Sequence, residues 1–275
     1  MAFSVNTNAG AFAALQNLNK TTASLNTTQT QINTGLKVSS AKDDAATFAI
    51  AQKLRADVAG LNAVKGSLDR ATSTIDVAIA AGEAVSDLLI ELKEKAVAAK
   101  DSGLDTASRT SLNNDFSQLR AQITSIVSNA EFNGSNAVNT GGDAIVAITN
   151  DTGSNVISIA AQDLSVGGAN VTLTGTQSIG TETAAALVVT AIESSISNVN
   201  DALSALGSGA KRIELQRSFV DKLSDSIEVG VGNLVDADLA KTSANLQSLQ
   251  VKQQLGLQAL SIANQAPGTV LSLFR

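Results

Sequence analysis

Asp43 and Asp44 are the residues whose type and spacing most suggest chemistry. Two neighbouring carboxylates can hold a metal ion or divide general acid and general base roles between them. Asp236 and Asp238 form a second such pair. However, Ser40-Ala41-Lys42-Asp43 has the pattern of a capping box with Asp in place of Glu. Both pairs also precede helix-like segments, where acidic side chains contribute about 0.3–1 kcal/mol. We therefore interpret both pairs as helix caps.

The composition removes most other catalytic chemistry. The chain contains no Cys and no His, so it offers no thiolate, no imidazole base, and none of the usual zinc or haem ligands. Gly230-Val231-Gly232 follows no predicted strand, and the third glycine of a dinucleotide fingerprint would fall at Val235. We interpret it as a flexible joint, and Gly207-Ser208-Gly209 as a close helix contact or a break. The sequence predicts no enzyme, cofactor or metal site.

Charge and hydropathy narrow the class of protein further. The net charge is −6, which argues against nucleic-acid binding. No stretch has eighteen uninterrupted apolar residues, so no transmembrane helix is expected. The first basic residue is Lys20, so the start lacks the pattern of a secretory signal. The plain interpretation is a cytoplasmic protein, and a signal-independent export route would give the same pattern.

A long heptad stripe is the strongest structural signal. Its apolar residues alternate steps of four and three, which is typical of a coiled coil. At 1.5 Å per residue this helix would span about 75 Å, against about 50 Å for a compact globule of this length. The stripe is Ile50, Leu54, Asp57, Leu61, Val64, Leu68, Ala71, Ile75, Ala78, Gly82, Val85, Leu89, Leu92, Ala96 and Ala99.

Three further stripes have the same spacing. One ends at the turn signal Asn133-Gly134. The early, middle and late stripes are Leu15, Leu18, Thr22, Leu25, Gln29, Ile32 and Leu36; Leu112, Phe116, Leu119, Ile123, Ile126 and Ala130; and Ile192, Val199, Leu206, Ile213, Val220, Ile227 and Leu234.

The C-terminal helix shows two apolar stripes on a helical wheel. A surface helix of a monomer needs only one, so the second favours another copy of the chain, and a central helix in an intramolecular bundle is the alternative. The end 270–275 adds apolar residues that also need a partner. The first stripe is Val235, Leu239, Leu246, Leu249, Leu257 and Leu260, and the second is Val251, Leu255 and Ile262.

Residues 135–183 differ from the rest because they are rich in Gly, Asn, Thr and Ser. Short alternating apolar runs occur at 145–148, 156–159 and 171–173, and Asn150-Asp151-Thr152-Gly153 separates the first two like a hairpin turn. We predict a small β-rich insertion that is surface exposed. The predicted fold class is mainly α: an elongated, coiled-coil-like helical rod with paired N- and C-terminal helices.

Several of these segments resemble bacterial flagellins, over residues 1–140 and 185–275. The resemblance is to a short, alphaproteobacterial-like form with the two inner domains only. The matching segments are Asn17-Leu18-Asn19, Gly35-Leu36-Lys37-Val38 with Ser39-Ser40-Ala41-Lys42-Asp43-Asp44-Ala45-Ala46, Glu131-Phe132-Asn133-Gly134, Val235-Asp236-Ala237-Asp238-Leu239-Ala240, Ala263-Asn264-Gln265-Ala266-Pro267 and Val270-Leu271-Ser272-Leu273-Phe274-Arg275.

The resemblance implies a structural subunit that polymerises into the hollow filament of the flagellum, the propeller of swimming cells. It implies a terminal coiled-coil domain (1–40 and 236–275), a helical rod domain (41–134 and 184–235) and the insertion (135–183). It also implies secretion by type III export and an extracellular location. Implied partners are identical or sister flagellin subunits, hook–filament junction and filament cap proteins, and an export chaperone, without nucleic acid or membrane insertion.

The expected assembly interface combines the terminal stripes. Its residues are Leu15, Leu18, Leu25, Ile32, Leu36, Leu239, Leu246, Leu249, Val251, Leu255, Leu257, Leu260, Ile262, Leu271 and Phe274. The alternatives are a hook–filament junction protein and a secreted helical adhesin.

One segment departs from the flagellin pattern. In many flagellins the stretch matching Glu91 to Val97 reads Arg-x-Arg-Glu-Leu and belongs to a patch that an innate immune receptor recognises. Here Glu91 replaces the first Arg and Lys95 replaces the Leu. The resemblance therefore implies weak or no receptor activation. The Ser and Thr residues of 135–183 could accept O-linked sugars, as is common in that family.

Overall fold

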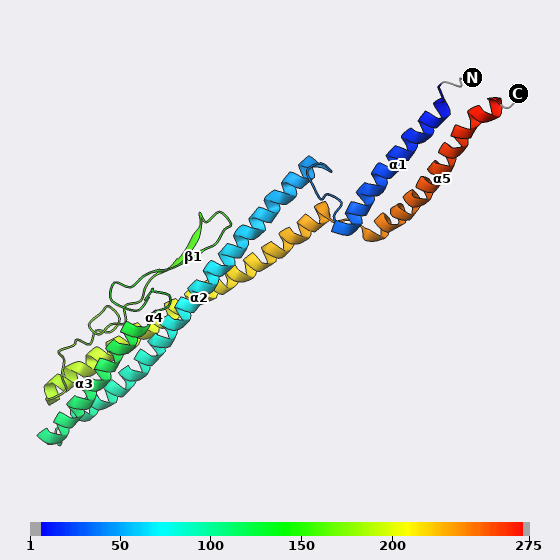
Figure 1. Ribbon diagram of the computed structural model, residues 1–275. Helices are drawn as coiled ribbons and strands as arrows, with labels where there is room; N and C mark the ends of the chain where they lie inside the picture. Colours follow the sequence, from blue (N-terminus) through cyan, green and yellow to red (C-terminus); the bar gives the residue numbers. More distant parts are fainter. Residues whose placement is uncertain (1–6, 272–275) are drawn as a thin grey trace. The chain divides into compact units, whose positions relative to one another are not determined.

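The computed structural model describes residues 7–271 of the chain. Within that range the chain forms five helices and one two-stranded sheet (Figure 1). In order these are α1 (Ala9–Thr34), α2 (Ala45–Ala99), α3 (Thr106–Asn129), β1 (Ile145–Ile148), β2 (Val156–Ile159), α4 (Glu182–Val235) and α5 (Leu239–Leu271). The predicted mainly α fold is confirmed.

The chain divides into two compact units. Unit 1 joins the two ends of the sequence, Met1–Ala56 and Ser226–Arg275, and unit 2 is Asp57–Asp225. The long helices α2 and α4 contribute residues to both units. The finer division expected from the sequence, with boundaries near residues 40, 134, 183 and 235, stays a prediction.

The core of unit 2 follows the predicted stripes of α2 and α4. From Leu61 to Ala99 the apolar members of the α2 stripe are at most 3% exposed. On α4 the members of the late stripe from Ile192 to Val220 are at most 1% exposed. The heptad spacing therefore predicts this core correctly, since large aliphatic side chains at these positions leave water together.

In unit 2, α2 and α4 run antiparallel in one register. Each step forward along α2 is matched by an equal step backward along α4. The contacts that show this are the ion pairs Lys65–Asp221 at 2.9 Å, Asp69–Arg217 at 3.1 Å and Lys93–Glu193 at 2.9 Å, and the close approach of Gly82 to Leu203.

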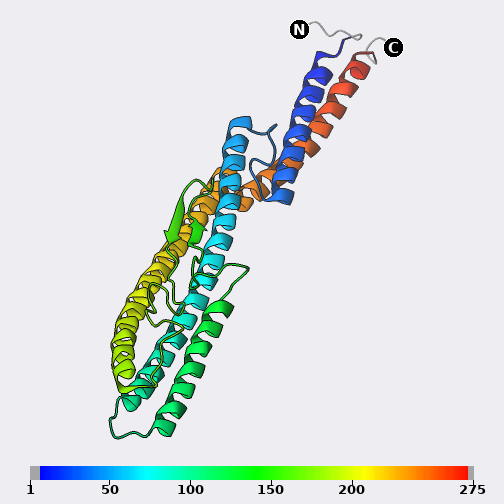
Figure 2. The ribbon, with the colours of Figure 1, turned by 90° about the vertical axis from the view of Figure 1, so that its left-hand side faces the viewer.

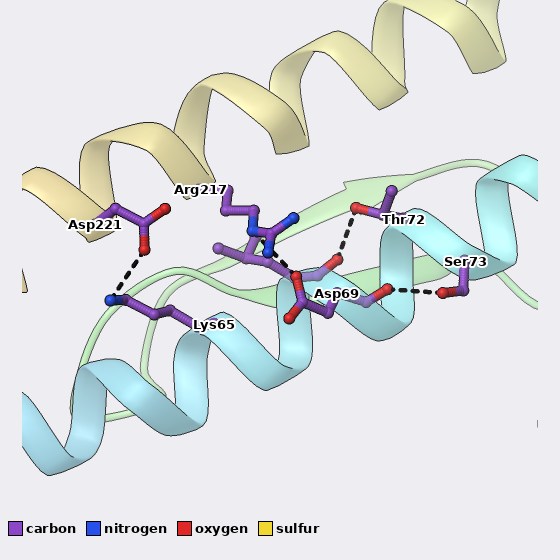
Figure 3. Close-up of polar contacts among 7 residues, drawn as sticks. Lys65, Asp69, Thr72, Ser73, Arg217 and Asp221 are labelled. Carbon is purple, nitrogen blue, oxygen red and sulfur yellow. Dashed lines mark hydrogen bonds and ion pairs between the residues drawn. The ribbon is translucent and has the colours of Figure 1, made fainter.

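The first two ion pairs alternate in polarity (Figure 3). If α4 slipped by one helical turn, Lys65 would meet Arg217 or Asp69 would meet Asp221, depending on direction. Each slip therefore places like charges together, so the pairs select the register more than they add stability.

The helix α3 is fastened to its neighbours by side chains that bind exposed backbone groups. Arg109 donates from Nε to the Ala99 carbonyl at 3.0 Å and from Nη2 to the Asp101 carbonyl at 2.8 Å, which satisfies the C-terminal end of α2. After α3, the predicted turn is confirmed: Asn133 and Gly134 have φ values of 51° and 83°. Such positive φ values are typical of an Asn-Gly hairpin turn.

The two predicted strands pair antiparallel, with Ile145 opposite Ile159. The remaining run, 171–173, forms no strand, although Val171 and Leu173 are fully buried. Figure 2 shows residues 135–181 lying along α2 and α4. Two buried serines, one on α2 and one on α4, bind this segment. Ser67 Oγ accepts from the Ile148 N–H, and Ser195 Oγ accepts from the Thr172 N–H.

The segment has buried apolar residues of its own, and its surface exposure as a whole stays a prediction. Val146 and Val156 are 53% and 54% exposed, whereas Ile145, Ala147, Leu164, Val171, Leu173 and Ile179 are at most 3% exposed. A few isolated apolar residues in a loop can fill gaps without any periodic pattern.

The structure tests two interpretations of glycine motifs. Both Gly207-Ser208-Gly209 and Gly230-Val231-Gly232 lie inside the unbroken helix α4. A Cβ on Gly209 would lie 2.7 Å from Ile159 Cδ1, so this glycine admits β2 to the helix surface. The interpretation as a close contact is therefore right for the first motif, though its neighbour is the hairpin. The second motif is helix rather than a joint, because Val231 packs in a small core with Val38, Ala51 and Val235.

Candidate assembly surfaces

In unit 1, α1 and α5 pack against each other as an antiparallel pair. Asn8, the N-cap of α1, donates from Nδ2 to the Ala263 carbonyl at 2.6 Å. Farther along, Leu18 Cδ1 lies 3.3 Å from the position a Cβ on Gly256 would take. The terminal helices are thus paired as the sequence predicts.

The inward positions of both helices alternate steps of three and four, which is a coiled-coil seam. The seam positions are Ala11, Ala14, Leu18, Thr21, Leu25, Thr28 and Ile32 on α1, where Thr22 and Gln31 beside the seam are also half-buried, and Thr242, Leu246, Leu249, Gln253, Gly256, Leu260 and Ala263 on α5.

This seam differs from the predicted α1 stripe at Leu15 and Gln29, which are exposed, whereas the predicted Thr22 is half-buried beside Thr21. Leu18, Leu25 and Ile32 lie on it as predicted, but Leu15 is 43% exposed. Small side chains at 14, 21 and 28 take the other positions. The most apolar residues did not identify every seam position, because helices that pack closely need small side chains between them.

The other end of the α1–α5 pair is closed by backbone hydrogen bonds. Gly35 ends α1 in the left-handed conformation, with φ of 71°. Its carbonyl accepts from the Ala237 N–H at 2.8 Å, and the Val235 carbonyl accepts from the Lys37 N–H at 2.6 Å. Leu36 is half-buried against the small core of Val38, Ala51, Val231 and Val235. At this core Ala51 is buried while Ile50 is 53% exposed, so the predicted α2 stripe begins one position too early.

Of the paired carboxylates, Asp43, Asp44 and Asp238 cap a turn or a helix. Asp43 accepts from the N–H and hydroxyl groups of Ser39 and Ser40, and these hydrogen bonds, those of Ser39 foremost, lower the pKa of Asp43. Asp44 accepts from the Ala46 and Thr47 N–H groups, and its bond from the Thr47 hydroxyl contributes most to its lowered pKa. The predicted capping box closes a turn, and Asp44 is the residue that caps α2.

Asp238 caps α5 in the same way. Its Oδ1 accepts from the Lys241 N–H at 3.0 Å.

Among the residues that the structure describes, no group of three or more acidic side chains lies close enough together to hold a metal ion. Within the same residues, no helix is both long and apolar enough to span a bilayer.

Several predicted interface residues stay uncovered on the α1–α5 pair. Leu246, Leu249 and Leu260 face the seam and are half-buried. Leu271 and Phe274 lie outside the residues whose side chains are described. The exposed members of the predicted set, with exposed fractions in parentheses, are Leu15 (43%), Leu239 (51%), Val251 (55%), Leu255 (57%), Leu257 (54%) and Ile262 (69%).

Leu239 and Leu257 therefore leave the stripe to which the helical wheel assigned them. The wheel treated Val235 and Leu239 as one helix, whereas α4 ends at Val235 and α5 begins at Leu239. At the other position Gly256 occupies the seam because Leu18 packs there, and Leu257 is rotated outward.

Some exposed apolar residues lie outside the predicted stripes. Phe12 of α1 is 65% exposed, and Ile90, Val97, Leu215 and Phe219 of unit 2 are at least 50% exposed. These residues could have been found from the sequence, because they recur at heptad spacing on a second face of their own helix. The residues that depart from the flagellin receptor pattern, Glu91 and Lys95, flank the buried Leu92 of α2; Glu91 is exposed and Lys95 is half-buried.

Comparisons with known proteins agree over almost the whole chain. Residues 5–140 match the bacterial flagellin N-terminal helical region and residues 189–274 match the bacterial flagellin C-terminal helical region. Flagellin FljM of Caulobacter vibrioides is 49% identical, with 99% of this chain and 98% of that protein covered. A flagellin of Brucella melitensis is 36% identical, with 99% of each covered.

Solved structures show the same fold at lower identity. The crystal structure of Bacillus cereus flagellin aligns with a TM-score of 0.50 and 21% identity, over 56% of this chain and 88% of that one. A putative flagellar hook-associated protein from Vibrio parahaemolyticus aligns with a TM-score of 0.57 and 13% identity, over 70% of this chain and all of that one. The chain belongs to the bacterial flagellin family and is a structural subunit of the flagellar filament.

Proposed function

We propose that copies of this chain join in the filament through the apolar residues that α1 and α5 leave uncovered. The observation that carries the proposal is the exposure of Val251, Leu255 and Ile262 on a helix whose other face already packs on α1. Covering one such side chain contributes about 1.5–3 kcal/mol. A subunit with several of them is therefore stabilised by its neighbours.

Negative-stain electron microscopy after salting-out tests this proposal. The full chain should form long hollow filaments, and a chain lacking residues 236–275 should form none. Because that truncation also uncovers the seam of α1, point variants provide the sharper comparison. Leu255→Gln should raise the critical concentration for assembly about tenfold or more, since burial of one leucine is lost.

Gln250→Ala is the control, because this side chain is polar and exposed on α5 and lies off the stripe of Val251, Leu255 and Ile262. It should assemble like the unsubstituted chain. Equal assembly of Leu255→Gln and the unsubstituted chain would contradict a role for this face. Filament growth by the purified chain alone also distinguishes a filament subunit from a junction protein or a monomeric adhesin.

We infer that the chain is secreted by the flagellar export route and meets an export chaperone, the hook–filament junction and the filament cap. Its membership of the flagellin family supports this inference. Cells that carry the export apparatus should release the chain into the filament fraction, and otherwise identical cells without it should retain the chain. Retention in both strains would contradict export by this route.

We propose further that the monomer activates the innate flagellin receptor weakly or not at all. The support is the exposed Glu91 where many flagellins have Arg, and Lys95 where they have Leu. A reporter-cell assay should show little response, and the variant Glu91→Arg/Lys95→Leu should respond more strongly. Potent activation by the unsubstituted monomer would contradict the proposal.

A further inference from the structure

A stripe on α4 of unit 2 combines exposed apolar side chains with cations. Leu215 and Phe219 are 61% and 57% exposed. Arg212 and Lys222 flank them at heptad spacing and are also exposed. Neither cation forms an ion pair with any residue that the structure describes. We call Arg212, Leu215, Phe219 and Lys222 the cationic stripe.

A second stripe, on α2 of the same unit, has the opposite charge. Ile90 and Val97 are 57% and 50% exposed, and Glu83, Asp87 and Glu94 occupy the other heptad positions of this face and are exposed. None of the three carboxylates is ion-paired within residues 7–271. We call Glu83, Asp87, Ile90, Glu94 and Val97 the acidic stripe.

The two stripes cannot meet within one copy. The cationic stripe surrounds Arg217, which pairs with Asp69 of α2 (Figure 3). The acidic stripe surrounds Ile90, close to Lys93, which pairs with Glu193 of α4. About twenty residues of straight helix separate the two levels, which is about 30 Å at 1.5 Å per residue.

The stripes match each other when the two helices run antiparallel. Arg212 then meets Glu94, Leu215 meets Ile90, Phe219 meets Asp87 and Lys222 meets Glu83, with the spacing of three and four kept at every step. Because α2 and α4 are antiparallel within a copy, this contact forms between two copies that point the same way. An apolar pair such as Leu215 and Ile90, flanked by complementary charges, is typical of specific helix contacts.

We propose that in the filament the cationic stripe of one copy packs on the acidic stripe of a neighbouring copy, displaced by about 30 Å along the helices. The proposal deepens the assembly function, on which it rests, by naming a second interface away from the terminal helices. The contact uses different surfaces on its two sides. Such a contact does not close on itself and so extends a polymer indefinitely.

Disulfide trapping tests the contact directly, because the chain has no native Cys. Filaments of the full chain with Ile90→Cys and Leu215→Cys should yield a ladder of covalent oligomers on oxidation. The matched control pairs Ile90→Cys with Ser218→Cys, an exposed α4 position outside the stripe, and should stay monomeric under denaturing conditions. Filaments that give no ladder, or an equal ladder in the control, would overturn the proposed contact.

A charge exchange provides the second measurement. Lys222→Glu should raise the critical concentration about threefold to tenfold, as expected for loss of one ion pair, and Glu83→Lys in the same chain should restore it. Lys100→Glu, an exposed change of the same charge, should have little effect. No rescue by Glu83→Lys would overturn the pairing. Failure of the unsubstituted chain to form filaments would instead overturn the assembly function, and this contact with it.

Discussion

The side chain of Asp44 accepts hydrogen bonds from the Ala46 and Thr47 N–H groups at 3.0 and 3.1 Å and from the Thr47 hydroxyl at 2.7 Å. Asp105 binds the Ser108 N–H at 2.7 Å, and Asp238 binds the Lys241 N–H at 3.0 Å. These carboxylates satisfy the first turns of α2, α3 and α5, whose N–H groups have no partner within the helix. At the scale of the residue, these three carboxylates stabilise helix N-termini.

Replacing Asp44 with Ala should therefore lower the free energy of unfolding by about 0.5–2 kcal/mol, as for loss of other N-caps. Urea unfolding of the monomer measures the change. Asp76→Ala is the control, because Asp76 is exposed in the middle of α2 and such changes stay within about 0.5 kcal/mol. Equal losses in the two variants would contradict the capping role of Asp44.

The same hydrogen bonds predict how stability depends on pH. They lower the pKa of Asp43, Asp44 and Asp105 below the ordinary value of 3.8. The folded chain then binds fewer protons than the unfolded chain near that pH. The contribution of these groups to stability is complete above about pH 5 and is lost as the pH drops through the lowered values.

Urea unfolding between pH 6 and pH 3 should show this decline, and Asp43→Asn should show a shallower one, because its side chain has no proton to gain. Asp76→Asn controls for the removal of one charge. A decline in Asp43→Asn as steep as in the unsubstituted chain would exclude Asp43 as a contributor.

At the scale of the element, glycines decide how closely the parts of unit 2 approach. A Cβ on Gly60 would lie 2.9 Å from atoms of Asp151 in the hairpin turn, and one on Gly82 would lie 2.7 Å from Leu203. Each glycine costs a helix about 1 kcal/mol relative to alanine. That cost is offset where the absence of a side chain lets a neighbouring segment pack closely against the helix.

Gly207 and Gly209 allow a direct test, since they lie two residues apart in α4. A Cβ on Gly207 would meet nothing within 4 Å, whereas one on Gly209 would meet three atoms of Ile159 at 2.7–3.1 Å. Gly207→Ala should stabilise the chain by about 0.5–1 kcal/mol. Gly209→Ala should be less stable than Gly207→Ala by about 1–3 kcal/mol, because of overpacking. Equal unfolding free energies would contradict close packing of β2 on α4.

The sequence predicts some elements better than others, for physical reasons. The seams of α2 and α4 were predictable, because Leu68, Leu89, Ile192 and Leu206 repeat in a regular pattern. The seam of α1 was half predictable, because Thr21 and Thr28 are polar and carry no such signal. Even so, the Thr28 hydroxyl donates to the Ser24 carbonyl at 2.9 Å, which lets that side chain be buried.

Residues 160–181 were the least predictable part of the fold. Leu164 and Ile179 are buried without any periodicity, and their places depend on contacts distant in sequence. One such contact is the Asn113 Oδ1, which accepts from the Ile179 N–H at 2.8 Å. The outward residues of α5 could be predicted from its second apolar stripe. The cationic and acidic stripes of unit 2 could be matched to each other only once the register of α2 and α4 was known.

At the scale of the whole molecule, the two units differ in charge and in burial. Unit 1 has eight basic and five acidic residues, and unit 2 has eleven basic and twenty acidic residues. Among described side chains, α1 buries Leu25 and Thr28 and α5 buries Thr242, whereas the shared seams of unit 2 are buried over many turns. Little buried area means low local stability.

Hydrogen exchange should therefore separate the units. In the free monomer, backbone amides of α1 and α5 should exchange much faster than those of α2 and α4 within residues 57–225. In the filament, the α1 and α5 amides should become slow, because neighbours cover their outer faces. Slow exchange of α1 and α5 in the monomer would show that the pair is stable alone and would contradict coupling between assembly and ordering.

The hydrogen bonds of Gly35 and Lys37 to Ala237 and Val235 join the two ends of the chain, and this determines the order in which the two units fold. Residues 57–225 are contiguous and can fold as soon as they have left the ribosome or an export channel. Unit 1 must wait, because α1 is made first and its partner α5 is made last. A molecule delivered from its N-terminus therefore holds an unfinished helix until delivery is nearly complete. The pairing of α1 with α5 is therefore the last folding step, and it begins only when the last segment of the chain arrives.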